Sequence, residues 1–134
     1  MSRAVATAAL CLLAAAGCGN RETPDLFAVE RYGSVPAARL SLRVNDNGQV
    51  RCNGGERRRM ADQLVLDARG IARELNEVAP RTLAPRPGSV LRYRLELEEG
   101  AVRFADNSRG QSEEMFETQA FVRRVAREVC GLPR

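Results

Sequence analysis

Apolar and polar residues alternate in two parts of the chain, and this period of two predicts half-buried β-strands. In residues 40–44 and 91–97, leucine, valine or tyrosine takes every second position, with arginine, serine or glutamate between. Residues 26–32, 49–52 and 102–104 also favour strands, because they hold aromatic and β-branched residues between turn signals. The pair Asn47-Gly48 predicts a tight hairpin before the strand that ends at Cys52.

Two other stretches have the spacing of a helix with one apolar face. The first is expected to run from Asp62, as its cap, to about Ala79, where Pro80 ends it. Its apolar stripe consists of Leu64, Ala68, Ile71, Leu75 and Val78. The second helix is expected to follow Ser112 as its cap and to stop at Gly131. Its inner side consists of Met115, Phe121, Val122, Val125 and Val129.

The order of these elements, βββ-α-ββ-α, predicts a single α+β domain over residues 26–134. We expect an antiparallel sheet of about five strands with the two helices packed on one face. The strand alternation leaves the other face polar and rich in arginine. That face is either solvated or a binding surface.

A separate apolar run, residues 4–16, lies between Arg3 and a polar stretch, and it is too short to span a bilayer. Residues 1–17 therefore indicate a signal peptide and export. The sequence Ala15-Ala16-Gly17-Cys18 resembles the lipobox of bacterial lipoproteins. The resemblance implies cleavage before Cys18, a lipid on its thiol, attachment to the bacterial cell membrane, and a lipidated tether over residues 18–25. The alternative is an ordinary secretory signal, cleaved at residues 14–16, that leaves Cys18 as a plain thiol.

Of the four cysteines, Cys11 would leave with the signal peptide and Cys18 would carry the lipid. Cys52 and Cys130 then form an even pair in an exported chain. In an oxidising compartment they most simply form one disulfide. Two free thiols are the alternative.

All 21 basic residues are arginine, histidine is absent, and 17 acidic residues leave a formal net charge of +4, or +3 without Arg3. So small an excess indicates solubility and some attraction to anionic lipid or envelope polymers. Without histidine, lysine or a free cysteine, the usual pairs of nucleophile and base are missing. We expect a monomer that is not an enzyme and has no metal, cofactor or nucleic-acid partner.

The densest positive charge is the run Arg57, Arg58 and Arg59, which could clamp a phosphate or carboxylate polymer or simply lead into the first helix. Alternation directs Arg39, Arg43, Arg92 and Arg94 to the same kind of face, where Glu96 and Glu98 could equally pair with them. The loop that contains Asp106 and Asn107 could carry recognition, or these side chains could cap turns.

Residues 30–40 resemble the strand, glycine turn and strand that open emfourin-like proteins, which are small inhibitors of thermolysin-type metallopeptidases. Residues 92–97, the short hairpin after them, Asp106 and the closing helix resemble the second half of that family. The resemblance implies a non-catalytic binding module, a protease inhibitor whose partner would be an envelope metallopeptidase. The other hypothesis is a structural or ligand-binding lipoprotein that holds anionic envelope polymers or lipid head groups on its arginine-rich sheet face.

Overall fold

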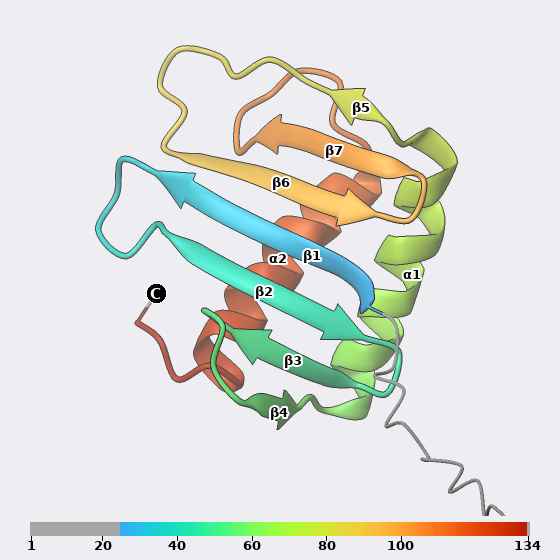
Figure 1. Ribbon diagram of the computed structural model, residues 1–134. Coiled ribbons are helices and arrows are strands. Elements are labelled where there is room, and N and C mark those ends of the chain that lie inside the picture. The colour runs from blue at the N-terminus through green and yellow to red at the C-terminus, as the bar shows by residue number, and fades with distance from the viewer. Residues whose placement is uncertain (1–24, 134) are drawn as a thin grey trace, which may run out of the picture.

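Two helices and a seven-stranded sheet form an α+β fold in residues 25–133, the part of the chain that the computed structural model describes. In chain order the elements are β1 (Asp25–Gly33), β2 (Leu40–Asn45), β3 (Gln49–Cys52), β4 (Arg57–Arg59), α1 (Asp62–Val78), β5 (Arg81–Thr82), β6 (Leu91–Leu97), β7 (Gly100–Ala105) and α2 (Glu113–Glu128). The strands lie in the order β4-β3-β2-β1-β6-β7-β5. Both helices cover the same side of the sheet, and the other side, here called the open face, has no helix over it (Figure 1).

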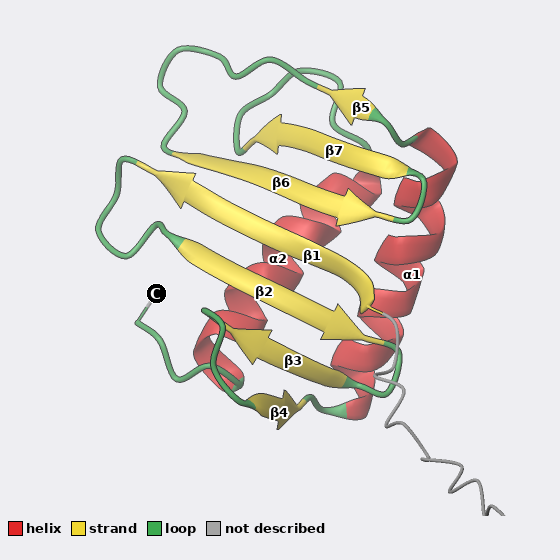
Figure 2. Ribbon diagram, in the orientation of Figure 1, coloured by secondary structure: helices red, strands yellow, loops and turns green. Residues whose placement is uncertain are grey.

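The α+β class with two helices is confirmed, but five strands were too few. The two extra strands, β4 and β5, lie at opposite edges of the sheet (Figure 2). Each is two or three residues long, and neither has an apolar alternation that would mark it as a strand. The sheet is mixed rather than purely antiparallel, because β5 pairs in parallel with β7. Three arginines along β4 also make that edge a poor template for adding another strand.

The core lies between the sheet and the helices, as the alternation predicts. Every second residue of β2 is fully buried, beginning with Leu40, while Ser41 and Arg43 between them are exposed. The same alternation buries Tyr93 and Leu95 in β6. An edge-to-face contact between Phe27 and Phe121, with ring centroids 5.9 Å apart, joins β1 to α2 across this core.

Three predictions about α1 and α2 need correction. The cap position of α1 is Ala61, so Asp62 lies in the first turn, where its charge favours the helix N-terminus without capping it. Val78 is 38% exposed and lies outside the buried stripe, whereas Ala72 belongs to it. Ser112 does occupy the cap position of α2, but its side chain makes no capping hydrogen bond.

The second helix ends earlier than predicted, because α2 stops at Glu128 with Val129 as its C-cap, and Gly131 lies two residues beyond the cap. Gly131 adopts a left-handed conformation with φ of 66°. The chain then turns back, and the backbone nitrogen of Leu132 donates a hydrogen bond of 2.9 Å to the carbonyl oxygen of Ala126. The chain therefore reverses direction after the helix at Gly131, in a left-handed conformation that glycine adopts at no steric cost.

Candidate ligand-binding surface on the open sheet face

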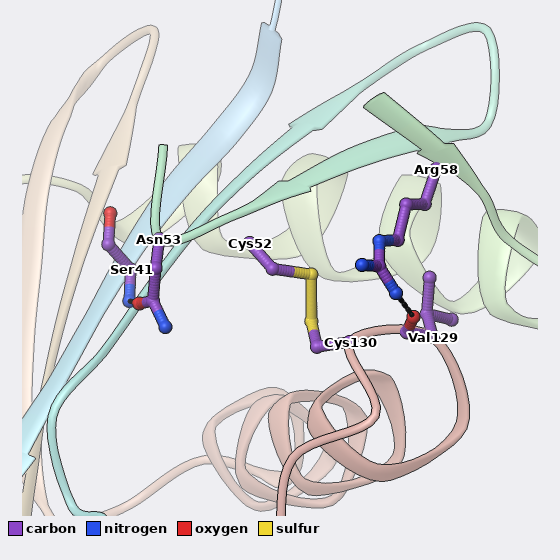
Figure 3. The surroundings of a disulfide bond; sticks show 6 residues. All are labelled: Ser41, Cys52, Asn53, Arg58, Val129 and Cys130. Atoms are coloured by element: carbon purple, nitrogen blue, oxygen red, sulfur yellow. Dashed lines mark hydrogen bonds between the residues drawn. A yellow bond between two sulfur atoms is a disulfide. The ribbon is translucent and has the colours of Figure 1, made fainter. Parts of the chain in front are cut away.

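The two cysteines of the described chain form the disulfide that the sequence predicts. Cys52 ends β3, Cys130 follows α2, and their Cα atoms are 5.9 Å apart although 78 positions separate them in the sequence. The bond fixes the end of α2 to the sheet (Figure 3). The predicted lipid attachment at Cys18 and the leader before it lie outside the described residues.

The arginine run of β4 divides between the two faces of the sheet. Arg58 pairs with the buried residue Val50, so it lies on the helix side, and its Nη1 donates a hydrogen bond of 3.0 Å to the carbonyl oxygen of Val129 (Figure 3). This carbonyl lies at the C-terminal end of α2, where a cation is favourable. Arg57 alternates with Arg58 and therefore lies on the open face, whereas Arg59 lines a pocket together with Asp62 and other residues of α1.

Three arginines stand opposite one another on the open face. Arg43 of β2 pairs with Arg51 of β3, and Arg51 pairs in turn with Arg57 of β4. Directly opposed side chains in a sheet are close neighbours, and like charges in such positions are destabilising. Arg43 is also within 3.3 Å of the Asp25 carboxylate, although 66% of its side chain remains exposed. We call Arg43, Arg51 and Arg57 the arginine row.

Charge on the open face is unbalanced along the strands. By register and alternation its arginines are Arg43, Arg51, Arg57, Arg92, Arg94 and Arg103, and its acids are Asp25, Glu30 and Glu96. The possibility that Glu96 pairs with a neighbouring arginine is confirmed for Arg94, which forms an ion pair with it. The open face therefore carries an excess of positive charge.

A pocket of about 350 Å³ lies on the open face at the end of β1. It is lined by Tyr32, Gly33, Ser34, Arg39, Ser89, Val90 and Arg92. Tyr32 pairs directly with Arg92 of β6, and Arg39 lies just before Leu40, the β2 partner of Arg31. Arg39, Tyr32 and Arg92 are therefore neighbours across the sheet, and 42% of Tyr32 is exposed. We call these three residues the tyrosine pocket.

Two residues that the sequence does not predict as part of a site, Arg31 and Gly33, hold the walls of the tyrosine pocket. Arg31 is only 8% exposed, and it donates hydrogen bonds to the carbonyl oxygens of Ala38, at 2.9 Å, and Ala37, at 3.1 Å. These bonds fix the chain immediately before Arg39. Gly33 lies so close to β6 that an added Cβ would be 1.9 Å from the carbonyl oxygen of Val90. A bulky residue would push the two strands apart at the pocket.

Asp106 and Asn107, the predicted recognition residues of the 106–110 loop, bind the loop before β6. The Asp106 carboxylate accepts hydrogen bonds from the hydroxyl of Ser89 at 2.9 Å and from the backbone nitrogens of Val90 and Leu91 at 3.2 and 3.3 Å. The Asn107 side chain accepts from the backbone nitrogen of Arg86 and donates to two carbonyl oxygens of the same loop. Their polar atoms therefore position the chain that leads to Arg92.

Tyr93 lies on the opposite side of β6 from the tyrosine pocket, within the core. Its ring stacks on that of Phe104 with centroids 5.3 Å apart. Burial raises the pKa of the Tyr93 hydroxyl above its ordinary value of 10.0, since a buried phenolate would lose its hydration. The nearby charges of Arg31 and Arg123 oppose this rise in pKa, and Asp106 adds to it.

Within residues 25–133, no three histidine, cysteine or acidic side chains are placed so that they could hold a metal ion together. In the same residues, neither helix has the length and apolar surface needed to cross a membrane. The open face of the described chain presents guanidinium groups beside the exposed ring of Tyr32, and guanidinium groups can pair with carboxylates and phosphates.

No protein-family model, curated protein or solved structure matches the chain.

Proposed function

We propose that this protein is an exported, lipid-anchored envelope protein without catalytic activity, whose open sheet face binds an anionic polymer. The observation that carries the proposal is the arginine row, in which Arg43, Arg51 and Arg57 oppose one another across three strands. Neighbouring strands lie about 4.8 Å apart, so the row presents positive charge at regular intervals across the sheet.

A polymer with carboxylates or phosphates at repeated positions suits such a surface. A guanidinium group carries a planar fork of donors, whose geometry matches a carboxylate or phosphate through two parallel hydrogen bonds. The excess of arginine over acid extends over the rest of the face and would attract a polyanion from solution. A single small anion would use only part of this surface.

Export is supported by the leader pattern of residues 1–17 and by the disulfide between Cys52 and Cys130. Structural disulfides persist mainly in oxidising compartments. Mass spectrometry of the mature N-terminus should find a lipidated Cys18, and Cys18→Ser should release the protein from the membrane fraction. A native protein that still begins at Met1 in the cytosol would overturn this part of the proposal.

Polymer binding is tested with the detergent-solubilised protein and two probes, a short oligomer of galacturonic acid and linear polyphosphate. We expect affinity for both to fall steeply as salt rises, because salt screens exposed charges. Replacing Arg43, Arg51 and Arg57 together by glutamine should lower affinity at least tenfold. The matched control replaces Arg73, Arg109 and Arg127, which lie outside the sheet, and changes net charge equally.

Two results would contradict polymer binding. One is a failure of the unmodified protein to bind either probe, and the other is an equal loss of affinity in the control variant. A metallopeptidase inhibitor, the other class of binding module, should instead lower peptidase activity at near-stoichiometric ratio and be insensitive to moderate salt. Inhibition of this kind would show that the protein is a peptidase inhibitor and not a polymer-binding protein.

A further inference from the structure

We infer that the tyrosine pocket is a subsite for one acidic sugar unit. The sugar ring would lie on Tyr32, and its carboxylate would lie between the guanidinium groups of Arg39 and Arg92. The inference rests on the proposed function, and it narrows the anionic polymer to an acidic polysaccharide.

Within the described sheet, the arginines of the tyrosine pocket have no acidic residue opposite them, unlike Arg94 elsewhere on the open face. The cross-strand row that holds Tyr32 and Arg92 continues to Ala105 and contains no acid. Within residues 25–133, Arg39 and Arg92 form no ion pair, whereas Arg94 pairs with Glu96. Two guanidinium groups on either side of one pocket are therefore open to an anion from outside the protein.

The pocket is also built before any ligand arrives. Arg31 holds the two carbonyl oxygens before Arg39, and Asp106 holds the backbone before Arg92. Neither arginine of the pocket has to give up a hydrogen bond within the described chain to bind a carboxylate. The backbone that carries both arginines is therefore fixed before binding, which reduces the conformational entropy lost when the ligand binds.

The side chains that line the pocket indicate the class of ligand. An exposed aromatic ring gives an apolar surface, which a phosphate group cannot use but the apolar face of a sugar ring can cover. A carboxylate is planar, and its geometry matches the fork of a guanidinium group. A volume of about 350 Å³ is at the lower end of the range for small-molecule sites, which fits one unit of a chain rather than a long segment.

The position of the pocket favours a polymer over the lipid head groups of the membrane that holds the protein. Asp25, where the predicted tether meets the sheet, and Tyr32 lie at opposite ends of β1. The seven steps along the strand from Asp25 to Tyr32 span about 23 Å. The pocket therefore lies at the end of the sheet away from the predicted lipid anchor.

The test uses calorimetric titration of the detergent-solubilised protein with the galacturonic acid oligomer, with polyphosphate, and with a neutral galactose oligomer of the same length. Tyr32→Ala leaves the charge unchanged, so it should weaken galacturonate binding about tenfold and leave polyphosphate binding unchanged. Arg92→Lys keeps the charge but removes the fork, and it should also weaken galacturonate binding. The neutral oligomer should not bind detectably.

A variant that gains affinity separates charge recognition from damage to the fold. Glu30 lies one position before Arg31 on β1 and lines a second pocket together with Arg39. Glu30→Gln removes this nearby negative charge, and it should strengthen galacturonate binding about twofold.

The outcomes distinguish the subsite from the proposed function. If galacturonate and polyphosphate bind equally, and Tyr32→Ala and Arg92→Lys change neither, the subsite is wrong and the polymer-binding face stands. If neither anion binds, both fail. Binding of galacturonate that depends on Tyr32 and is strengthened by Glu30→Gln supports the subsite.

Discussion

The disulfide between Cys52 and Cys130 joins β3 to the chain two residues after the end of α2, with the two Cα atoms 5.9 Å apart. Beside them, Arg58 donates a hydrogen bond to the carbonyl oxygen of Val129. The covalent bond and the hydrogen bond act on the same end of α2, which supplies Phe121, Val122 and other residues to the core. Docking of this helix therefore depends strongly on the cysteine pair.

Removing the disulfide should destabilise the protein by about 4.5 kcal/mol, the loop-closure entropy for a separation of 78 residues. The variant is Cys52→Ala with Cys130→Ala, and the measurement is the free energy of unfolding in urea. Reduction of the unmodified protein should give a similar loss. A double variant that unfolds at the same urea concentration as the oxidised protein would show that the bond adds no stability.

Two glycine substitutions should have opposite effects on stability. Gly33→Ala would place a Cβ 1.9 Å from the carbonyl oxygen of Val90, so we expect a loss of about 1 to 3 kcal/mol. Gly70→Ala lies within α1 with no atom within 4 Å of the new Cβ, and it should stabilise by about 0.5 to 1 kcal/mol. Thermal unfolding of both variants measures the difference. A neutral Gly33→Ala would mean that β1 and β6 separate there without cost.

The long strands and both helices could be predicted from sequence because burial imposes a period on them. Residues 40–44 and 91–97 show a period of two, and each helix has one apolar side. The strands β4 and β5 could not be found in this way. Each is held by backbone pairing at a sheet edge, and Arg57–Arg59 and Arg81–Thr82 bury no apolar face.

The apolar spacing of α1 predicts its buried residues as far as Leu75 but is wrong for Val78, at the end of the helix. Val78 continues the spacing of Leu75, but it is the last residue of the helix, and 38% of its surface is exposed. Leu75 is completely buried.

Leu75→Ala should therefore cost about 2 to 5 kcal/mol of stability, since it leaves a cavity in the core. Val78→Ala removes an exposed side chain and should cost less than about 1 kcal/mol. Urea unfolding of the two variants compares them directly. Equal losses would mean that the end of α1 is packed more tightly than its exposure shows.

The candidate site could be predicted only in part, because strand register is needed to assemble it. Alternation alone places Arg39, Arg43, Arg92 and Arg94 on one face. It does not show that Arg43 opposes Arg51, or that Tyr32 lies beside Arg92. Those relationships follow from pairing between strands that are distant in sequence, so the sequence alone predicts only that Tyr32 belongs to a strand.

Alkaline pH should destabilise the protein through Tyr93. Burial raises the pKa of its hydroxyl above 10.0 in the folded state, so the folded protein holds this proton more tightly than the unfolded chain does. The stabilisation is fully present below pH 10.0 and is lost as the pH rises through the folded pKa.

Tyr93→Phe should therefore leave the free energy of unfolding nearly unchanged at pH 7. Above pH 10.0 the variant should lose less stability with rising pH than the unmodified protein does. The chain has two tyrosines, so in a Tyr32→Phe background the ultraviolet absorbance of phenolate reports Tyr93 alone. We expect its titration midpoint to lie above 10.0 in the folded protein and to fall on unfolding in urea. A midpoint that is the same in both states would mean that the hydroxyl reaches water despite the burial of its ring against Phe104.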